Sequence, residues 1–138
     1  MASYNKFNVT VLDLAQKVHN LGSDTLKVML TNTAPVAANA VKADITDLST
    51  SGGYTAGGGT ATLVSSAQSS GLYTLKLNNV TTTASGAVGP FRYAVLYNST
   101  AASGNLIGWW DYGSAVTLAN GDTFTVSFDG TNGVLTLQ

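Results

Sequence analysis

The sequence contains no cysteine and no glutamate, and charged residues make up only 9% of its 138 positions. Without cysteine, neither a disulfide nor a thiolate-ligated metal site can form. Charged residues usually make up roughly 25% of a soluble domain, so this chain has unusually few of them. Because the net charge is −1 and no run of like charges occurs, long-range electrostatics predict neither nucleic acid nor an anionic membrane as a partner.

Long apolar runs are also missing, although hydrophobic residues make up 44% of the chain. No stretch approaches the roughly 20 residues that a membrane-spanning helix needs. The N-terminus is polar and its first apolar segment is interrupted by charged and amide side chains, so we expect no signal peptide and no membrane partner. A chain of this length can bury a sizeable core, and we expect residues 1–138 to form a single domain.

Turn-forming residues and short apolar runs alternate in the C-terminal part of the chain. The runs cover residues 91–97, 106–112, 123–129 and 134–137. Apolar residues recur in them with the period of two that is typical of β-strands. The Asn-Gly and Asp-Gly pairs between the runs are strong hairpin signals, because tight reversals need positive φ angles. The pattern therefore predicts an antiparallel meander over residues 89–137.

The alternation also assigns strand faces within this meander. One face of the first run is expected to carry these residues: Phe91, Tyr93, Val95 and Tyr97. The opposite face, with Ala94 and Leu96, is largely apolar too, which predicts a central strand. In the third run, Phe124 and Phe128 are expected to face the core, while the threonines and serine between them face solvent.

An amphipathic helix is predicted over about residues 7–21. Apolar residues recur there at intervals of 4, 3, 4 and 3: Phe7, Val11, Leu14, Val18 and Leu21. This spacing places them along one face of a helix, and Gly22 follows where a helix commonly ends. We expect Asp13 and Lys17 to form a pair on the solvent face. His19, the only histidine, is expected to be exposed near the C-terminus of the helix.

The middle of the chain has weaker patterns. A half-exposed strand is predicted over residues 26–31, a short helix near residues 43–48, and a strand over residues 72–77 that turns Leu75 and Leu77 inward. Weak strands are expected at residues 60–66 and 80–88. Residues 51–59 contain five glycines in nine positions, so we expect an extended, mobile loop whose one apolar anchor is Tyr54.

No catalytic constellation emerges from the sequence. On the predicted helix, His19 has no neighbour that could serve as a nucleophile in a triad. The carboxylates Asp44 and Asp47 lie in a segment rich in small residues, where turn and capping roles are expected rather than acid–base catalysis. Asp122 and Asp129 likewise belong to turns. We therefore expect no catalytic residue, no metal and no enzyme activity.

Gly57, Gly58 and Gly59 lack the lysine of a phosphate-binding loop, so no nucleotide or other cofactor is expected. The adjacent residues Trp109 and Trp110 must point to opposite faces of a strand. A sugar-stacking platform is one interpretation of this pair. The favoured interpretation is that one tryptophan fills the core and the other packs at a subunit contact, where tryptophan is enriched. The candidate interface residues are Tyr54, Trp109, Trp110 and Tyr112.

Four segments together resemble the head decoration, or cement, proteins of tailed bacteriophages. They read NKFNVTVLDLAQKVHNLGSDTLKVMLTNTAP, GGYTAGG, GPFRYAVLYN and LIGWWDYGSAVTLANGDTFTVSFDGTNGVLTL. The resemblance covers nearly the whole chain but is carried by strand and turn patterns rather than by a catalytic signature. It implies a β-sandwich of jelly-roll type, assembled as an oligomer on the outside of a capsid, with no catalytic residue.

The expected fold class is accordingly mainly β: an antiparallel, jelly-roll-like β-sandwich with one N-terminal α-helix. The expected function is non-enzymatic stabilisation of the capsid lattice. The partners would be the major capsid protein and further copies of the chain, as a dimer or trimer. The protein would reside on the exterior of the virion, and in the host cytoplasm during assembly. The alternative is a tail or fibre module that binds a host-surface glycan.

Overall fold

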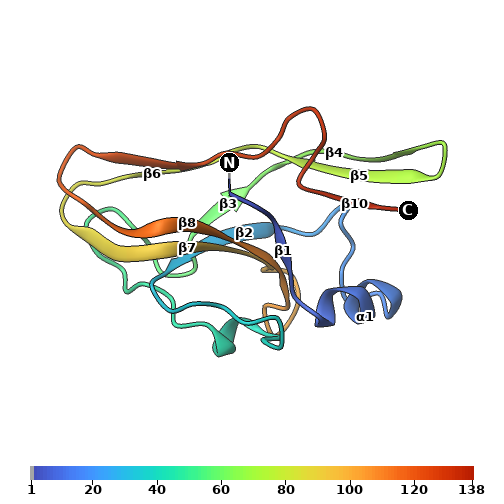
Figure 1. The fold of residues 1–138 in the computed structure, drawn as a ribbon, viewed down its shortest axis with the longest axis horizontal. Coiled ribbons are helices and arrows are strands. Elements are labelled where there is room, and N and C mark those ends of the chain that lie inside the picture. Colours follow the sequence, from blue (N-terminus) through green and yellow to red (C-terminus); the bar gives the residue numbers. More distant parts are fainter. Residues whose placement is uncertain (1) are drawn as a thin grey trace.

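The computed structural model describes residues 2–138, and their fold is mainly β with antiparallel pairing of the strands. Figure 1 shows the strands in two layers, with the single α-helix, α1 (Val9–Ala15), beside the lower one. The predicted class, an antiparallel β-sandwich with one N-terminal α-helix, is confirmed.

The larger sheet has five strands in the order β1-β8-β7-β2-β3. Their bounds are β1 (Asn5–Lys6), β8 (Leu106–Leu118), β7 (Val88–Asn98), β2 (Leu26–Thr31) and β3 (Gly59–Ala61). The strand β7 pairs with β8 on one side and with β2 on the other, so the prediction that it is central is confirmed. The prediction that β2 is half exposed is wrong: both of its edges are paired, and all its residues except Lys27 are buried.

The second layer consists of two small sheets, with the strand orders β10-β5-β4 and β6-β9. Their bounds are β4 (Leu63–Ser69), β5 (Leu72–Leu77), β6 (Val80–Thr83), β9 (Thr123–Val126) and β10 (Leu135–Leu137). In Figure 1, β6 and the β4–β5 hairpin extend to opposite sides of this layer. The strand β5 matches its predicted bounds, and Leu75 and Leu77 are buried as expected.

Two clusters of buried side chains cover the two faces of the larger sheet. The first lies between the layers and includes Leu30 and Leu96 together with Leu75 of the second layer. The second lies on the opposite face of the larger sheet: Phe7, Met29, Ile45, Val95, Tyr97 and Leu106. Alternation along β2 and β7 divides their residues between these clusters, because successive side chains of a strand point to opposite faces.

Phe91 does not share a face with Tyr93 and Val95, so that part of the face assignment is wrong. Phe91 pairs with Val116, whereas Tyr93 pairs with Asp111. One residue of β7, Arg92, therefore lies opposite four residues of β8, and these form a bulge at 112–115. The bulge contains Gly113 at a φ of 101°. As a result, Phe91 is buried in the first core cluster beside Ala94 and Leu96.

The predicted C-terminal meander is also wrong beyond its first hairpin. The strands β7 and β8 pair with each other, but β9 pairs with β6 and β10 pairs with β5. The change of layer occurs at a turn after β8, where the Asp122 carboxylate accepts a hydrogen bond from Ala119 N at 2.9 Å and Asp122 N donates to Ala119 O at 3.0 Å. Hairpin signals in the sequence identify such a turn but not the strand that is paired after it.

The helix is much shorter than the predicted range of residues 7–21. It ends after Ala15 in a Schellman arrangement, in which Lys17 has a φ of 65° and Val18 N donates to Asp13 O at 2.8 Å. Phe7 and Leu21 are buried outside the helix, and Val11, within it, is exposed. The apolar spacing therefore reflects burial of the flanking segments rather than one continuous helical stripe.

The segment between β2 and β3 packs on the body of the protein. It contains a 3-10 helix, η1 (Lys42–Asp44), in place of the helix predicted at residues 43–48. In the glycine-rich part, Tyr54 is only 3% exposed and belongs to the first core cluster. The Gly58 backbone, at a φ of 76°, lies so close to Val28 that a Cβ would collide with the Val28 carbonyl. The expectation that Tyr54 anchors this segment is confirmed, and glycine at position 58 permits close backbone packing.

Candidate functional site

A cleft of about 350 Å³ lies between β8 of the larger sheet and the segment formed by β9 and the residues after it. Seven of its lining residues are aromatic, and five of these, all except Phe91 and Tyr93, are taken together as a group: Tyr4, Trp110, Tyr112, Phe124 and Phe128. Small-molecule sites are typically apolar concavities of roughly 300–1,000 Å³ with a few polar groups. The aromatic cleft, as we call the space between these five side chains, is therefore the leading candidate site.

The rings of the aromatic cleft contact one another at steep angles. The centroid of Trp110 lies 5.5 Å from that of Tyr4 and 5.5 Å from that of Phe128. At the other end, Phe124 lies 5.5 Å from Tyr112 and 4.8 Å from the buried Phe91, with interplanar angles of 75° and 78°. Tilted and edge-to-face contacts are the favoured geometries of aromatic pairs. The rings therefore support one another in a preformed arrangement.

The N-terminal strand closes one end of the cleft. The Tyr4 hydroxyl donates a hydrogen bond to Ile107 O at 3.2 Å, and its ring lies where a side chain at position 108 would otherwise project. Gly108 is required for this approach because a Cβ there would collide with the Tyr4 ring. Burial raises the pKa of Tyr4 to about 12. Tyr4 therefore remains a neutral phenol at any ordinary pH.

The charged groups at the cleft already have hydrogen-bond partners within the protein. Arg92 donates from Nε and Nη2 to the two carboxylate oxygens of Asp111, at 2.8 and 2.9 Å. This bidentate pair lowers the pKa of Asp111 below its usual range, chiefly through the hydrogen bond from Arg92. Asp129 accepts from Thr131 N and Asn132 N, and its pKa is lowered mainly by the backbone hydrogen bond from Asn132. Arg92, the basic residue of the lining, is therefore engaged, while Asp129 stays an ionised carboxylate.

The structure brings together two of the four predicted interface residues. Trp110 and Tyr112 both line the aromatic cleft, and Tyr112 is 58% exposed. Trp109 points to the opposite face, as expected from strand alternation, where it packs on Phe7 with 4.5 Å between ring centroids. Tyr54 is wrongly placed among the interface residues: its hydroxyl lies inside the protein, where it donates to Asp47 Oδ1 and accepts from Leu30 N.

Phe124 and Phe128 alternate with exposed residues as predicted, but they are only partly buried and line the cleft. The prediction that they face the core is confirmed, although neither residue is fully buried. Both pack against the first core cluster on one side and are open to the cleft on the other. Period-two alternation identified the face of β9 correctly, but it gives no information on whether another layer covers that face completely.

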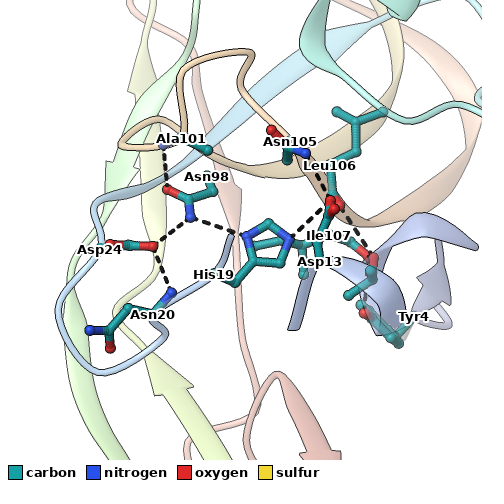
Figure 2. Close-up of polar contacts among 11 residues, drawn as sticks. Tyr4, Asp13, His19, Asn20, Asp24, Asn98, Ala101, Asn105, Leu106 and Ile107 are labelled. Atoms are coloured by element: carbon teal, nitrogen blue, oxygen red, sulfur yellow. Dashed lines mark hydrogen bonds and ion pairs between the residues drawn. The ribbon is translucent and has the colours of Figure 1, made fainter. Parts of the chain in front are cut away.

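A second polar cluster surrounds His19, whose predicted exposure is wrong: the residue is only 6% exposed. Figure 2 shows its ring between Asn98 and Asp13. Asn98 Nδ2 donates to His19 Nδ1 at 3.1 Å and to Asp24 Oδ2 at 2.6 Å. The Asn98 amide orientation follows from its Oδ1, which accepts from the backbone N–H groups of Thr100 and Ala101. The proton of a neutral His19 must therefore reside on Nε2.

The Nε2 atom of His19 has no hydrogen-bond partner among residues 2–138 and lies 3.8 Å from Asp13 Oδ2. Asp13 is itself buried, so the expected surface pair with Lys17 is wrong; its carboxylate accepts from Asn105 Nδ2 at 2.8 Å. Burial lowers the pKa of His19, and this effect outweighs the opposing attraction of Asp13 and Asp24. A side chain with no exposed surface cannot contact a substrate, so the cluster has a structural role.

Asp44 has the capping role expected from the sequence, but Asp47 does not. Asp44 accepts from Ala40 N at 2.8 Å and from Val41 N at 3.1 Å, and these hydrogen bonds lower its pKa. Asp47 instead holds the Tyr54 hydroxyl at 2.6 Å. Within residues 2–138, no group of three or more potential ligands is arranged to hold a metal ion.

In the part of the chain that the structure describes, no helix has the length and apolar character needed to cross a membrane. Comparison with protein-family models, with curated proteins and with solved structures found no match to this chain.

Proposed function

We propose that this protein is a non-enzymatic structural protein of a bacteriophage virion, of the decoration type. It binds the outside of the assembled capsid lattice, contacts the major capsid protein and further copies of itself, and holds neighbouring capsid subunits together. Such a protein stabilises the lattice by mass action, because it binds the assembled state and not the free subunit. The proposal rests on the sequence resemblance together with the surface described next.

The observation that carries the proposal is an exposed apolar surface around α1. Val11 and Leu12 are each 51% exposed, and Val36 is 55% exposed. Asn8 N donates to Ala37 O at 2.9 Å, which places the loop that contains Val36 beside the start of the helix. Val11 and Leu12 follow Asn8 by three and four positions and so lie on the same side of the helix. The three side chains form the α1 apolar surface.

The charge distribution supports association through apolar contacts. The chain has six basic and seven acidic residues, and Arg92 is paired with Asp111. A nearly neutral surface favours association over colloidal repulsion. Binding should therefore depend only weakly on salt, whereas an interface of ion pairs would weaken as the Debye length falls from about 10 Å at 0.1 M to about 3 Å at 1 M salt.

The test is to deplete virions of the protein and measure the temperature at which they release their genome. Depleted particles should assemble but release DNA at a lower temperature, and purified protein should restore the original temperature at both low and high salt. The double variant Val11→Ser/Leu12→Ser should fail to restore it. Val64→Ser is the matched control, because Val64 is an equally exposed aliphatic residue on β4, away from α1.

If depleted particles are as heat-stable as complete ones but do not adsorb to host cells, the decoration role is wrong and a tail or fibre role replaces it. If the double variant restores heat stability as well as Val64→Ser does, the protein acts as a cement but not through the α1 apolar surface. Copy number separates the two roles as well, since a decoration protein is present in amounts comparable to those of the major capsid protein.

A further inference from the structure

We propose that the aromatic cleft is a binding site for a neutral saccharide. The inference is independent of the virion role, because it rests on the cleft alone and the α1 apolar surface is made from other residues. Three properties of the cleft lead to this ligand class: its ring arrangement, the engagement of its one basic residue by Asp111, and its size.

The rings suit a ligand that has both an apolar face and a polar edge. Trp110, between Tyr4 and Phe128, forms one aromatic wall, and Tyr112 with Phe124 forms the other. A pyranose ring presents C–H groups on its faces, which pack on the electron-rich face of an aromatic ring. Its hydroxyl groups project from the edge, so one molecule can contact the rings and remain hydrogen-bonded at its periphery.

A polar group is available beside the rings. Tyr112 lines the cleft and is 58% exposed, so its hydroxyl can be hydrated in the free protein. A purely aliphatic ligand would desolvate this hydroxyl without replacing its hydrogen bonds to water, which is costly. A saccharide replaces them with its own hydroxyls. The lining therefore favours a saccharide over a lipid chain.

The charged residues of the lining disfavour anionic ligands such as nucleotides or sulfated glycans. Arg92 is already engaged by Asp111, and Asp129 is an ionised carboxylate that would repel an anion. A phosphate or sulfate would have to displace Asp111 from a bidentate pair, the strong form of charge-assisted hydrogen bond. The site therefore selects against anionic ligands.

The cleft has the size of a small-molecule site. Its volume of about 350 Å³ lies near the lower end of the roughly 300–1,000 Å³ typical of such sites, which suits a small saccharide. This volume is too small for an added β-strand, which is typically about 5–6 residues long. A peptide that extends the sheet at the free edge of β9 is therefore not the occupant that the cleft fits.

The experiment is a titration of the full chain with neutral sugars, followed by ¹H–¹⁵N NMR. The probes are glucose, galactose, N-acetylglucosamine, maltose, lactose and N,N′-diacetylchitobiose, with glucose 6-phosphate as the charged comparison. At least one neutral sugar should shift the Trp110 indole resonance in a saturable way, while the Trp109 indole on the opposite face should not move. Glucose 6-phosphate should bind more weakly than glucose.

Substitution at Tyr112 tests whether this cleft is the site. Tyr112→Ala should weaken binding by about tenfold or more through loss of a stacking ring, and Tyr112→Phe, which keeps the ring and loses only the hydroxyl, should weaken it less. Tyr112 is exposed, so both variants should keep the native spectrum elsewhere. Val36→Ala, outside the cleft, is the control and should bind normally. The proposal is overturned if no neutral sugar shifts Trp110 at tens of millimolar, or if binding survives Tyr112→Ala unchanged.

Discussion

The single histidine makes the pH dependence of folding a direct test of the cluster shown in Figure 2. The side chain of His19 has no exposed surface, and its Nδ1 accepts a hydrogen bond from Asn98, which requires the neutral ring. Protonation would turn Nδ1 into a donor facing the Asn98 amide nitrogen. It would also place a charge where neither Asp13 nor Asp24 makes a hydrogen bond to the ring. The folded state should therefore resist protonation.

The sign and size of the effect follow from linkage. In the unfolded chain, the pKa of His19 is near 6.5, and burial lowers the pKa in the folded chain. Just below pH 6.5, the unfolded chain therefore binds a proton that the folded chain does not. Stability should be constant from pH 7.5 to about 6.5 and then fall with decreasing pH, by up to about 1.4 kcal/mol per pH unit, until the folded pKa is reached.

Three of the seven acidic residues contribute no change in this interval. The pKa values of Asp44, Asp111 and Asp129 are lowered by hydrogen bonds in the folded state. Their contribution to stability is present above the ordinary carboxyl pKa, near 3.8, and is lost only as the pH falls below it. Comparison with the variant His19→Gln assigns the loss between about pH 6.5 and 4.5 to the histidine.

The assay combines urea unfolding at constant ionic strength, from pH 7.5 to 4.5, with an NMR titration of the His19 Hε1 resonance. Wild-type protein should lose stability below pH 6.5, whereas His19→Gln should give a flat profile over the same range. The NMR titration needs no variant and is unambiguous because there is one histidine. A folded-state pKa at or above 6.5, or a stability that rises on acidification, would refute the reasoning.

Three further predictions concern packing and can be checked by urea titration. Phe91→Ala should lower the free energy of unfolding by about 3–5 kcal/mol, because Phe91 is fully buried. Phe124→Ala should lower it by about 1–3 kcal/mol, because one side of the Phe124 ring is open to the cleft. Equal losses for the two variants would contradict the presence of the cleft. Tyr54→Phe should cost about 1–3 kcal/mol, since Leu30 N and the Asp47 carboxylate both lose a partner, and the more exposed Tyr73→Phe should cost less. Gly71→Ala should lower the free energy of unfolding by about 1–2 kcal/mol, because the backbone there has a positive φ and no atom lies near the added Cβ. Gly58→Ala should lower it far more, because its Cβ would also collide with the Val28 backbone. Similar losses at the two glycines would rule out the close packing at Gly58.

Local pattern was sufficient where a segment's structure depends on its own residues. The strand β5 was predicted at its observed bounds, and the alternation along β9 was correct, because each strand packs one face on the core. The helix was overpredicted for the opposite reason. Phe7 and Leu21 are buried through contacts of the chain before and after α1, so they extend the apolar spacing beyond the residues that are helical.

The His19 cluster could not be predicted from periodicity, since its members are distant in sequence. Asn98 contacts a histidine 79 positions earlier, and Asn105 contacts an aspartate 92 positions earlier. A lone histidine in an apolar-periodic segment gives no sign of these partners. The one usable signal was the position of His19 within a run whose neighbours Val18 and Leu21 are apolar, which is compatible with burial as well as with a helix end.

The aromatic cleft arises where local rules fail. Tyr112 belongs to the bulge in β8 that separates the pairing of Phe91 from that of Tyr93, and this irregularity is absent from the alternation pattern. Phe124 reaches the cleft because β9 leaves the meander and pairs with β6 instead. Bulges interrupt the regular hydrogen-bonded pairing of a sheet and are over-represented beside functional sites. The bulge in β8 and the pairing of β9 with β6 were both missing from the sequence prediction, and together they bring Tyr112 and Phe124 into contact. This makes the cleft a stronger candidate than any residue pair selected from the sequence alone.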